Sequence, residues 1–233
     1  MRFIEHIIEP TKLLLAWQSS DEKHRTRYIV AELNRIGEEI TLTYLPNTKD
    51  FNDAQQHGFE AYPAFQDTQK THRNVLDAFM RRLPPRTRGD FTQYLEGLRL
   101  KPTTQLSNFA LLGYSGAKLP SDGFSIIHPF NDINSPCELL IEVAGFRHIN
   151  PNAKIILNEP ASFSKEFNQA IQEEAIRINI IQQHIGYVCR GLLPSFSKWL
   201  DNKQITGAWV EKTNGMPGKP TVYLYVKISV GKA

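Results

Sequence analysis

The chain changes character at the stretch His128–Pro136, which reads His-Pro-Phe-Asn-Asp-Ile-Asn-Ser-Pro. Two prolines, two asparagines, an aspartate and a serine so close together are typical of a loop, because these residues favour turns over helix and strand. We place a domain boundary in this loop, between residues 1–133 and residues 134–233. The length of 233 residues fits two domains of ordinary size.

Before this loop, the sequence predicts a small sheet with three helices. Runs of β-branched, aromatic and aliphatic residues bounded by glycine or proline are typical of strands. Farther along, apolar residues recur at helical spacing, and Pro84-Pro85 ends the first of these segments. The predicted strands are Lys12–Gln18, Arg27–Leu33, Ile40–Leu45 and Phe124–Ile127, and the predicted helices span residues 75–83, 91–98 and 106–113.

After the loop, the sequence predicts mainly strands. The predicted strands span residues 137–144, 154–157, 175–181, 185–188, 205–212 and 221–230, and the one predicted helix spans residues 194–200. Many short strands with a single helix favour a small barrel or sandwich. The chain as a whole is therefore predicted to be α+β.

The composition is that of an ordinary globular protein, with 41% hydrophobic and 22% charged residues. No apolar run approaches the roughly 18 residues that a membrane span needs, so we expect no membrane partner. The N-terminal residues Met1–His6 include a carboxylate and an imidazole and no apolar core, which argues against a signal peptide. We therefore expect a cytoplasmic protein.

The net charge of +3 is small and unevenly placed. Residues 1–133 hold 16 basic and 16 acidic side chains, whereas residues 134–233 hold 11 basic and 8 acidic ones. Non-specific affinity for DNA grows with the number of phosphates that a protein neutralises. Any binding of nucleic acid is therefore expected to be local, and in the second half.

No pattern in the sequence indicates a catalytic site, a metal site or a cofactor. The seven histidines are scattered, with no pair spaced to share one helix face, and the two cysteines do not form a CxxC pair. The glycine motifs of phosphate and dinucleotide sites are missing, as is the serine motif of hydrolases. We expect a protein that is not an enzyme.

Four arginines surround the Pro84-Pro85 pair, namely Arg81, Arg82, Arg86 and Arg88. Guanidinium groups pair with phosphates and carboxylates, so the cluster is a candidate binding site for a partner. Alternatively, the first two arginines offset the dipole at a helix end, and the other two are solvated or bonded to loop carbonyls. Under both interpretations we expect these side chains to be mostly exposed.

Three aromatic residues, Phe59, Tyr62 and Phe65, cluster around Pro63 in a segment without a helix or strand period. A loop that exposed all three rings would form a large apolar patch and invite aggregation. We expect two of the three to pack onto their own domain.

A series of segments in the first half follows the order of elements in a known module. They are Arg27–Leu33, Thr43–Pro46, Phe79–Pro85, Phe109–Leu112, Gly116–Ala117 and the strand from Phe124. Over roughly residues 25–128 the chain resembles the N-terminal subdomain of HipA-type kinase toxins. The resemblance implies a small sheet with a helical insert that binds a protein partner. The ATP-binding and catalytic loops of the kinase core are missing.

The second half contains a better-defined series of segments. They are Val143–His148, Ile155–Pro160, Glu174–Ile178 and His184–Arg190, followed by the helix and two late strands. Over roughly residues 138–230 the chain resembles a HIRAN domain. The resemblance implies an OB-like β-barrel that binds single-stranded DNA or DNA ends and accompanies helicase or nuclease modules.

The resemblance to HIRAN domains extends to individual residues. Gly145 and the three residues after it match the family's glycine, hydrophobic, arginine and aromatic run, and the segment from His184 matches a later strand. The family's Asn-Pro-x-Asp sequence, which helps to hold a DNA end, is replaced by the insertion Ala161–Gln172. The candidate nucleic-acid-binding residues are Phe146, Arg147, His148, His184, Tyr187 and Arg190.

These observations predict a HipA-N-like module at residues 1–133 and a HIRAN-like domain at residues 134–233, and residues 1–133 are expected to fold without the second half. The expected function is non-catalytic binding of nucleic acid by the second half. The first half is expected to bind a protein, either a HipA-like kinase or a helicase or nuclease. The alternative function is that of an antitoxin-like regulator that binds and inhibits a HipA-like serine/threonine kinase.

Overall fold

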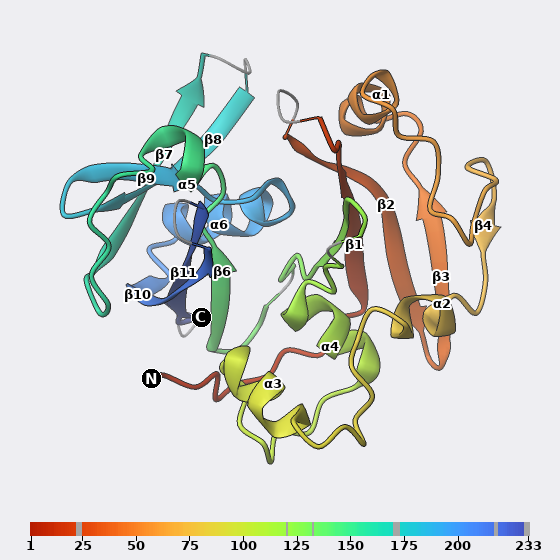
Figure 1. Cartoon of the computed structure of the whole chain (residues 1–233), viewed down its shortest axis with the longest axis horizontal. Helices are drawn as coiled ribbons and strands as arrows, with labels where there is room; N and C mark the ends of the chain where they lie inside the picture. The colour runs from red at the N-terminus through yellow and green to blue at the C-terminus, as the bar shows by residue number, and fades with distance from the viewer. Residues whose placement is uncertain (22–24, 120, 132, 170–172, 217–218, 231–233) are drawn as a thin grey trace. The chain divides into compact units, whose positions relative to one another are not determined.

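The computed structural model describes residues 1–21, 25–119, 121–131, 133–169, 173–216 and 219–230 (Figure 1). It is an α+β structure with 20% helix and 38% strand. In the ranges described, every helix is too short or too polar to span a bilayer.

The chain divides into two compact units. Unit 1 comprises Met1–Ile8, Leu95–Pro102 and Asn131–Ala233, and unit 2 comprises Glu9–Tyr94 and Thr103–Phe130. The last change between units, after Phe130, falls in the expected loop, of which Asp132 lies outside the described residues. The division differs from two contiguous halves because two early segments belong to unit 1.

Unit 2 is built on one antiparallel sheet with the strand order β4-β3-β2-β1-β5. Its strands are β1 (Lys12–Gln18), β2 (Arg27–Ile36), β3 (Glu39–Tyr44), β4 (Thr71–His72) and β5 (Phe124–Ile127). Its helices are α1 (Lys49–Gln56), α2 (Leu76–Met80) and α4 (Asn108–Ser115), and α3 (Phe91–Gly97) begins in unit 2 and ends in unit 1. The helix predicted over residues 75–83 is therefore shorter than expected.

The three aromatic residues around Pro63 pack as predicted. Phe59 and Tyr62 are buried, and Phe65 is half-buried with its ring stacked 5.9 Å from that of Tyr62. The Tyr62 ring also contacts Phe79 of α2, at 4.7 Å between ring centroids. These rings attach the irregular segment to the core of unit 2.

The arginine cluster corrects one expectation. Arg81, Arg86 and Arg88 are exposed as expected, but the side chain of Arg82 is only 2% exposed. Its guanidinium pairs with both oxygens of Asp122, at 2.8 and 2.9 Å, and donates to the carbonyl of Ala117 at 2.7 Å. A buried charge is stable only when it is paired in this way. Arg82 therefore joins α2 to the β5 segment and is not available to a partner.

Unit 1 contains two antiparallel sheets, with the strand orders β10-β11-β6 and β7-β8-β9. The strands are β6 (Cys137–Glu142), β7 (Ala161–Asn168), β8 (Glu173–Ile180), β9 (Gln183–Tyr187), β10 (Ile205–Met216) and β11 (Lys219–Ile228). The helices are α5 (Phe146–Ile149), the 3-10 turn η1 (Arg190–Leu192) and α6 (Leu193–Asp201), which packs on β7 and β8.

Neither sheet of unit 1 closes into the expected barrel. Among the described residues, isolated bridges join the edges of the two sheets, Ala144 with Tyr187 and Pro160 with Trp209. Proline has no N–H to donate, so a regular ladder cannot continue through the second bridge. The predicted strand at residues 154–157 is irregular instead, and β7 forms within the segment that the sequence presented as an insertion.

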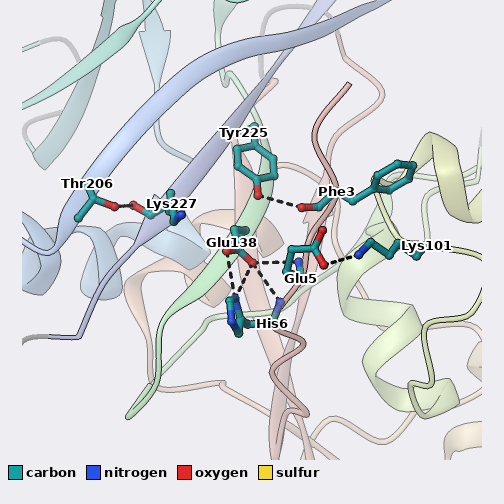
Figure 2. A network of polar contacts seen from close by, with 8 residues as sticks. All are labelled: Phe3, Glu5, His6, Lys101, Glu138, Thr206, Tyr225 and Lys227. Carbon is teal, nitrogen blue, oxygen red and sulfur yellow. Dashed lines mark hydrogen bonds and ion pairs between the residues drawn. The ribbon is translucent and has the colours of Figure 1, made fainter.

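One face of the β10-β11-β6 sheet is covered by residues 1–8, which we call the N-terminal strap. Glu138 of β6, only 2% exposed, accepts the backbone N–H groups of Glu5 and His6, both at 3.0 Å (Figure 2). The hydroxyl of Tyr225 in β11 donates to the carbonyl of Phe3 at 2.9 Å. The strap therefore supplies partners for polar groups that the sheet itself leaves unsatisfied.

A second buried carboxylate, Glu211 of β10, fastens the start of the strap. It accepts the N–H of Arg2 at 3.0 Å, pairs with the Arg2 guanidinium at 3.0 Å and accepts from Arg99 Nε at 2.7 Å. Burial acts to raise the pKa of Glu211, but the hydrogen bonds from Arg2 and Arg99 outweigh it and lower that pKa. Residues 1–8 and 95–102 are thus held by charge-assisted hydrogen bonds within unit 1.

Candidate nucleic-acid interface

The β8 strand alternates buried isoleucines with polar residues. Ile176, Ile178 and Ile180 are buried, whereas Arg177 and Asn179 between them are half-buried. Successive side chains of a strand point to opposite faces of its sheet. One face of the β7-β8-β9 sheet therefore belongs to the core, and the other carries polar side chains.

The register of the sheet shows which residues share this second face. Ser164 and Tyr187 both lie opposite Arg177, one on each neighbouring strand, and His184 lies opposite Asn179. Directly opposite residues point to the same face. We call this surface the polar face and define it by Ser162, Ser164, Glu166, Arg177, Asn179, His184 and Tyr187. All seven residues are half-buried or exposed.

Three side chains at the centre of the polar face form a chain of contacts across all three strands. The Tyr187 hydroxyl donates to Glu166 Oε1 at 2.8 Å, and Glu166 Oε2 lies 3.7 Å from an Arg177 nitrogen. Burial, and then the Glu166 carboxylate, raise the pKa of Tyr187 to about 12. The phenol therefore keeps its proton at neutral pH and remains a hydrogen-bond donor.

The His184 ring lies against Tyr187. Their ring centroids are 4.8 Å apart in an edge-to-face arrangement, and His184 Nε2 lies 3.2 Å from the carbonyl oxygen of Gly186. Burial and the nearby Arg177 guanidinium lower the pKa of His184 below its ordinary value. At neutral pH the face thus presents a neutral imidazole beside a neutral phenol.

The single-turn helix α5 lies next to β9 and β11. Gly145, with φ 75°, begins it in the left-handed region that favours glycine. Arg147 and His148 are exposed, and the Arg147 guanidinium donates to the carbonyl of Pro220 at 3.2 Å and to the Thr221 hydroxyl at 3.1 Å. These bonds hold a positive charge at the surface of unit 1.

Phe146 requires a correction. It is only 3% exposed, so its ring packs in the core and is not available to stack on a base. One turn of helix directs neighbouring side chains to different sides. The run Phe146–His148 is therefore divided between the core and the surface, with only its last two residues exposed.

Arg190 is half-buried in η1 and pairs with Glu173. Glu173 lies opposite Asn168, which places it on the same side of the sheet as Glu166. The structure thus brings His184 and Tyr187 together on one face, with Arg190 paired to a carboxylate of that face.

Glu166, Arg177 and Asn179 were not predicted from the sequence as site residues. The signal for two of them was present, because Arg177 and Asn179 alternate with three isoleucines over one strand length. The signal for Glu166 was not, because its strand was interpreted as an insertion. Only the pairing of β7 with β8 brings Glu166 beside Arg177.

The arrangement offers hydrogen bonding and stacking. Over the part of the chain that the structure describes, no group of three or more histidine, cysteine, aspartate or glutamate residues is placed to hold a metal ion.

Comparison of the chain with protein-family models, with curated proteins and with solved structures finds no match.

Proposed function

We propose that unit 1 binds single-stranded nucleic acid, without chemistry, across the polar face and the adjacent helix α5. The observation that carries the proposal is the combination of Arg177, His184 and Tyr187 on one open sheet face. Bases stack on aromatic, histidine and arginine planes with little regard to sequence. In a duplex the bases are already stacked on one another, so the same groups have less to bind.

The charges favour a local contact with the nucleic-acid backbone. Arg177 and Arg190 are each near a carboxylate of the same face, and the exposed Arg147 adds a positive charge on α5, next to β9. Such a surface neutralises few phosphates. The binding constant should therefore fall only gently with salt, with a slope of about two to four in a plot of its logarithm against the logarithm of the salt concentration.

We also propose that this unit is a HIRAN-like domain. The proposal is supported by the two segments that carry the resemblance, Val143–His148 and His184–Arg190, because they are neighbours in space. Ala144 and Tyr187 exchange two backbone hydrogen bonds, of 2.9 and 2.8 Å. Gly186 permits this approach, because a Cβ there would lie 2.5 Å from the carbonyl oxygen of Ala144.

For unit 2 we keep the proposal that it is a HipA-N-like module that binds a protein partner. The exposed arginines Arg81, Arg86 and Arg88 support this role, since guanidinium groups pair with carboxylates. Arg88 pairs with Asp90, and Arg86 donates to Asn108 and to the carbonyl of Leu106, so a partner has to compete with these exposed contacts. The test of this proposal is co-purification of the protein with a HipA-like kinase and, in parallel, with a helicase or a nuclease.

The proposed function of unit 1 is tested by fluorescence anisotropy with a labelled oligonucleotide, as a single strand and as a blunt duplex of equal length. We expect tighter binding of the single strand. Arg177→Gln should weaken that binding about fivefold or more, because it removes a charged donor. Lys227→Gln, which removes an exposed charge from the other sheet, is the matched control. Equal affinity for both forms would contradict the proposal.

A further inference from the structure

Glu166 occupies a position between two donors that come from different strands. Its Oε1 accepts the hydroxyl of Tyr187 in β9, while its Oε2 faces Arg177 in β8. The second separation, 3.7 Å, is longer than the roughly 2.7–2.9 Å of a close bond between a guanidinium and a carboxylate. The carboxylate therefore holds one donor tightly and the other loosely.

Arg177 keeps unused donor capacity. A guanidinium carries five N–H donors in a fixed fork. Within the described residues, its one hydrogen bond of ordinary length runs from Nε to Asn179 Oδ1, at 2.9 Å. This bond orients the guanidinium and leaves its terminal nitrogens directed elsewhere.

The oxygens of Glu166 face Arg177 and Tyr187 in the way that the oxygens of a phosphodiester would. Both groups offer two oxygens that share a negative charge, and both accept from a guanidinium fork and from a hydroxyl. Tyr187 remains protonated at neutral pH, so it can donate to either anion. The His184 ring, edge-to-face with that of Tyr187, places an aromatic group next to this position.

We infer that the Glu166 carboxylate occupies the site of a phosphate group between Arg177 and Tyr187, and that a bound strand displaces it. The inference rests on the proposed function and adds a regulatory element to it. A strand must compete with a carboxylate that is already in place and repels its phosphates. Glu166 thus limits the affinity of the polar face, and its removal strengthens binding.

The test compares wild type with Glu166→Gln, which removes the charge and keeps an oxygen that accepts from Tyr187. The matched control is Glu174→Gln. Glu174 is exposed on β8, opposite Phe167 and therefore on the other side of the sheet, and the net charge changes equally. Glu166→Ser is a second variant, because Ser162 and Ser164 already occupy equivalent positions on β7.

At low salt, Glu166→Gln and Glu166→Ser should bind a single-stranded oligonucleotide about two- to fivefold more tightly than wild type. Glu174→Gln should bind as wild type does. An equal gain in all three variants would overturn the inference and leave the proposed function standing, because it would show a general effect of charge. Failure of wild type and of both Glu166 variants to bind any strand would overturn both.

A second experiment determines whether the site binds free phosphate or only a phosphodiester within a strand. The NMR signals of the Tyr187 ring are followed while inorganic phosphate or the oligonucleotide is added. A shift with both ligands supports a site for any phosphate, and a shift with the oligonucleotide alone supports a site for a phosphodiester within a strand. No shift with either ligand would overturn the inference.

Discussion

The two sheets of unit 1 are both three-stranded and antiparallel, but their polar side chains have different surroundings. In the β10-β11-β6 sheet, Glu138 and Glu211 are only 2% and 6% exposed, and residues 1–8 and 95–102 provide their partners. In the β7-β8-β9 sheet, Arg177 and His184 are half-buried, and Ser162 and Ser164 on the same face are exposed. The first set of polar residues serves the fold, and the second is suited to a ligand.

The comparison teaches that a charged residue on a strand must be judged by what covers it. A buried carboxylate without a partner costs several kcal/mol, so a covered polar face has to be satisfied by the chain itself. A polar face near solvent has no such requirement, because water satisfies it until a ligand arrives. Residue type alone does not separate the two situations.

Deletion of the N-terminal strap, residues 1–8, is predicted to have the largest effect. It removes the backbone donors to Glu138, the Arg2 donors to Glu211 and the buried side chain of Ile4, while Arg99 still donates to Glu211. Removing the partners of a buried charge typically costs about 3–5 kcal/mol, and we expect a loss of at least this size. The measurement is the free energy of unfolding in urea.

The control for this deletion is Lys101→Ala, which breaks an exposed ion pair with Glu5 of the strap. An exposed pair contributes less than about 1 kcal/mol, so this variant should unfold almost as wild type does. If the deletion also leaves the free energy of unfolding unchanged, the strap is not what stabilises the covered face.

Most elements of the fold could be predicted from the sequence, because their apolar periodicity is strong. β1 has the predicted bounds Lys12–Gln18, and β5 has the predicted bounds Phe124–Ile127. The membership of residues 1–8 in unit 1 could not be predicted, since it depends on contacts between residues more than 130 positions apart, such as Glu5 and Glu138. A cut after residue 133 would therefore remove the strap and residues 95–102 from unit 1.

The candidate site could be predicted only in part. The exposure of Arg147 and His148 depends on α5, a helical turn that was not predicted, whereas the partial exposure of His184 beside the buried Ile185 follows from strand alternation. The burial of Phe146 and Arg82 does not, because their neighbours come from distant segments. The role of Glu166 depends on the register between β7 and β8, and the sequence analysis did not identify β7 as a strand.

Arg147→Ala is predicted to have an intermediate effect, confined to binding. The side chain is exposed, and its two hydrogen bonds to β11 are at the surface, so the fold should tolerate its loss. Affinity for a single strand should fall by about 1–2 kcal/mol, because a charged phosphate contact is lost. Anisotropy with the labelled strand measures the affinity, and urea unfolding is the control.

This variant also sharpens the comparison between the two sheets. Lys227 lies in β11 of the covered sheet and is likewise exposed. Lys227→Ala therefore removes the same charge from a position outside the polar face and α5. Equal losses of affinity for the two variants would show that only net charge matters. Unfolding of Arg147→Ala would instead assign Arg147 a structural role.

The smallest predicted effect is on the titration of His184. Burial, and then repulsion by Arg177, hold its pKa below 6.5, while the Gly186 carbonyl and Glu166 act in the opposite direction. Arg177→Gln should therefore raise this pKa, and Glu166→Gln should lower it further. The pKa is measured from histidine side-chain NMR signals, with His184→Gln used to assign the signal.

A bound phosphate adds a negative charge beside His184, so it should raise the pKa of the imidazole. A group whose pKa is higher in the complex takes up a proton on binding, and the affinity therefore increases as the pH falls. The increase begins near the pKa of the complex and ends near the lower pKa of the free protein. Above that window the imidazole is neutral in both states, so the affinity should not depend on the titration of His184. An affinity that still changes with pH in His184→Gln would assign the dependence to another group and separate His184 from the phosphate site.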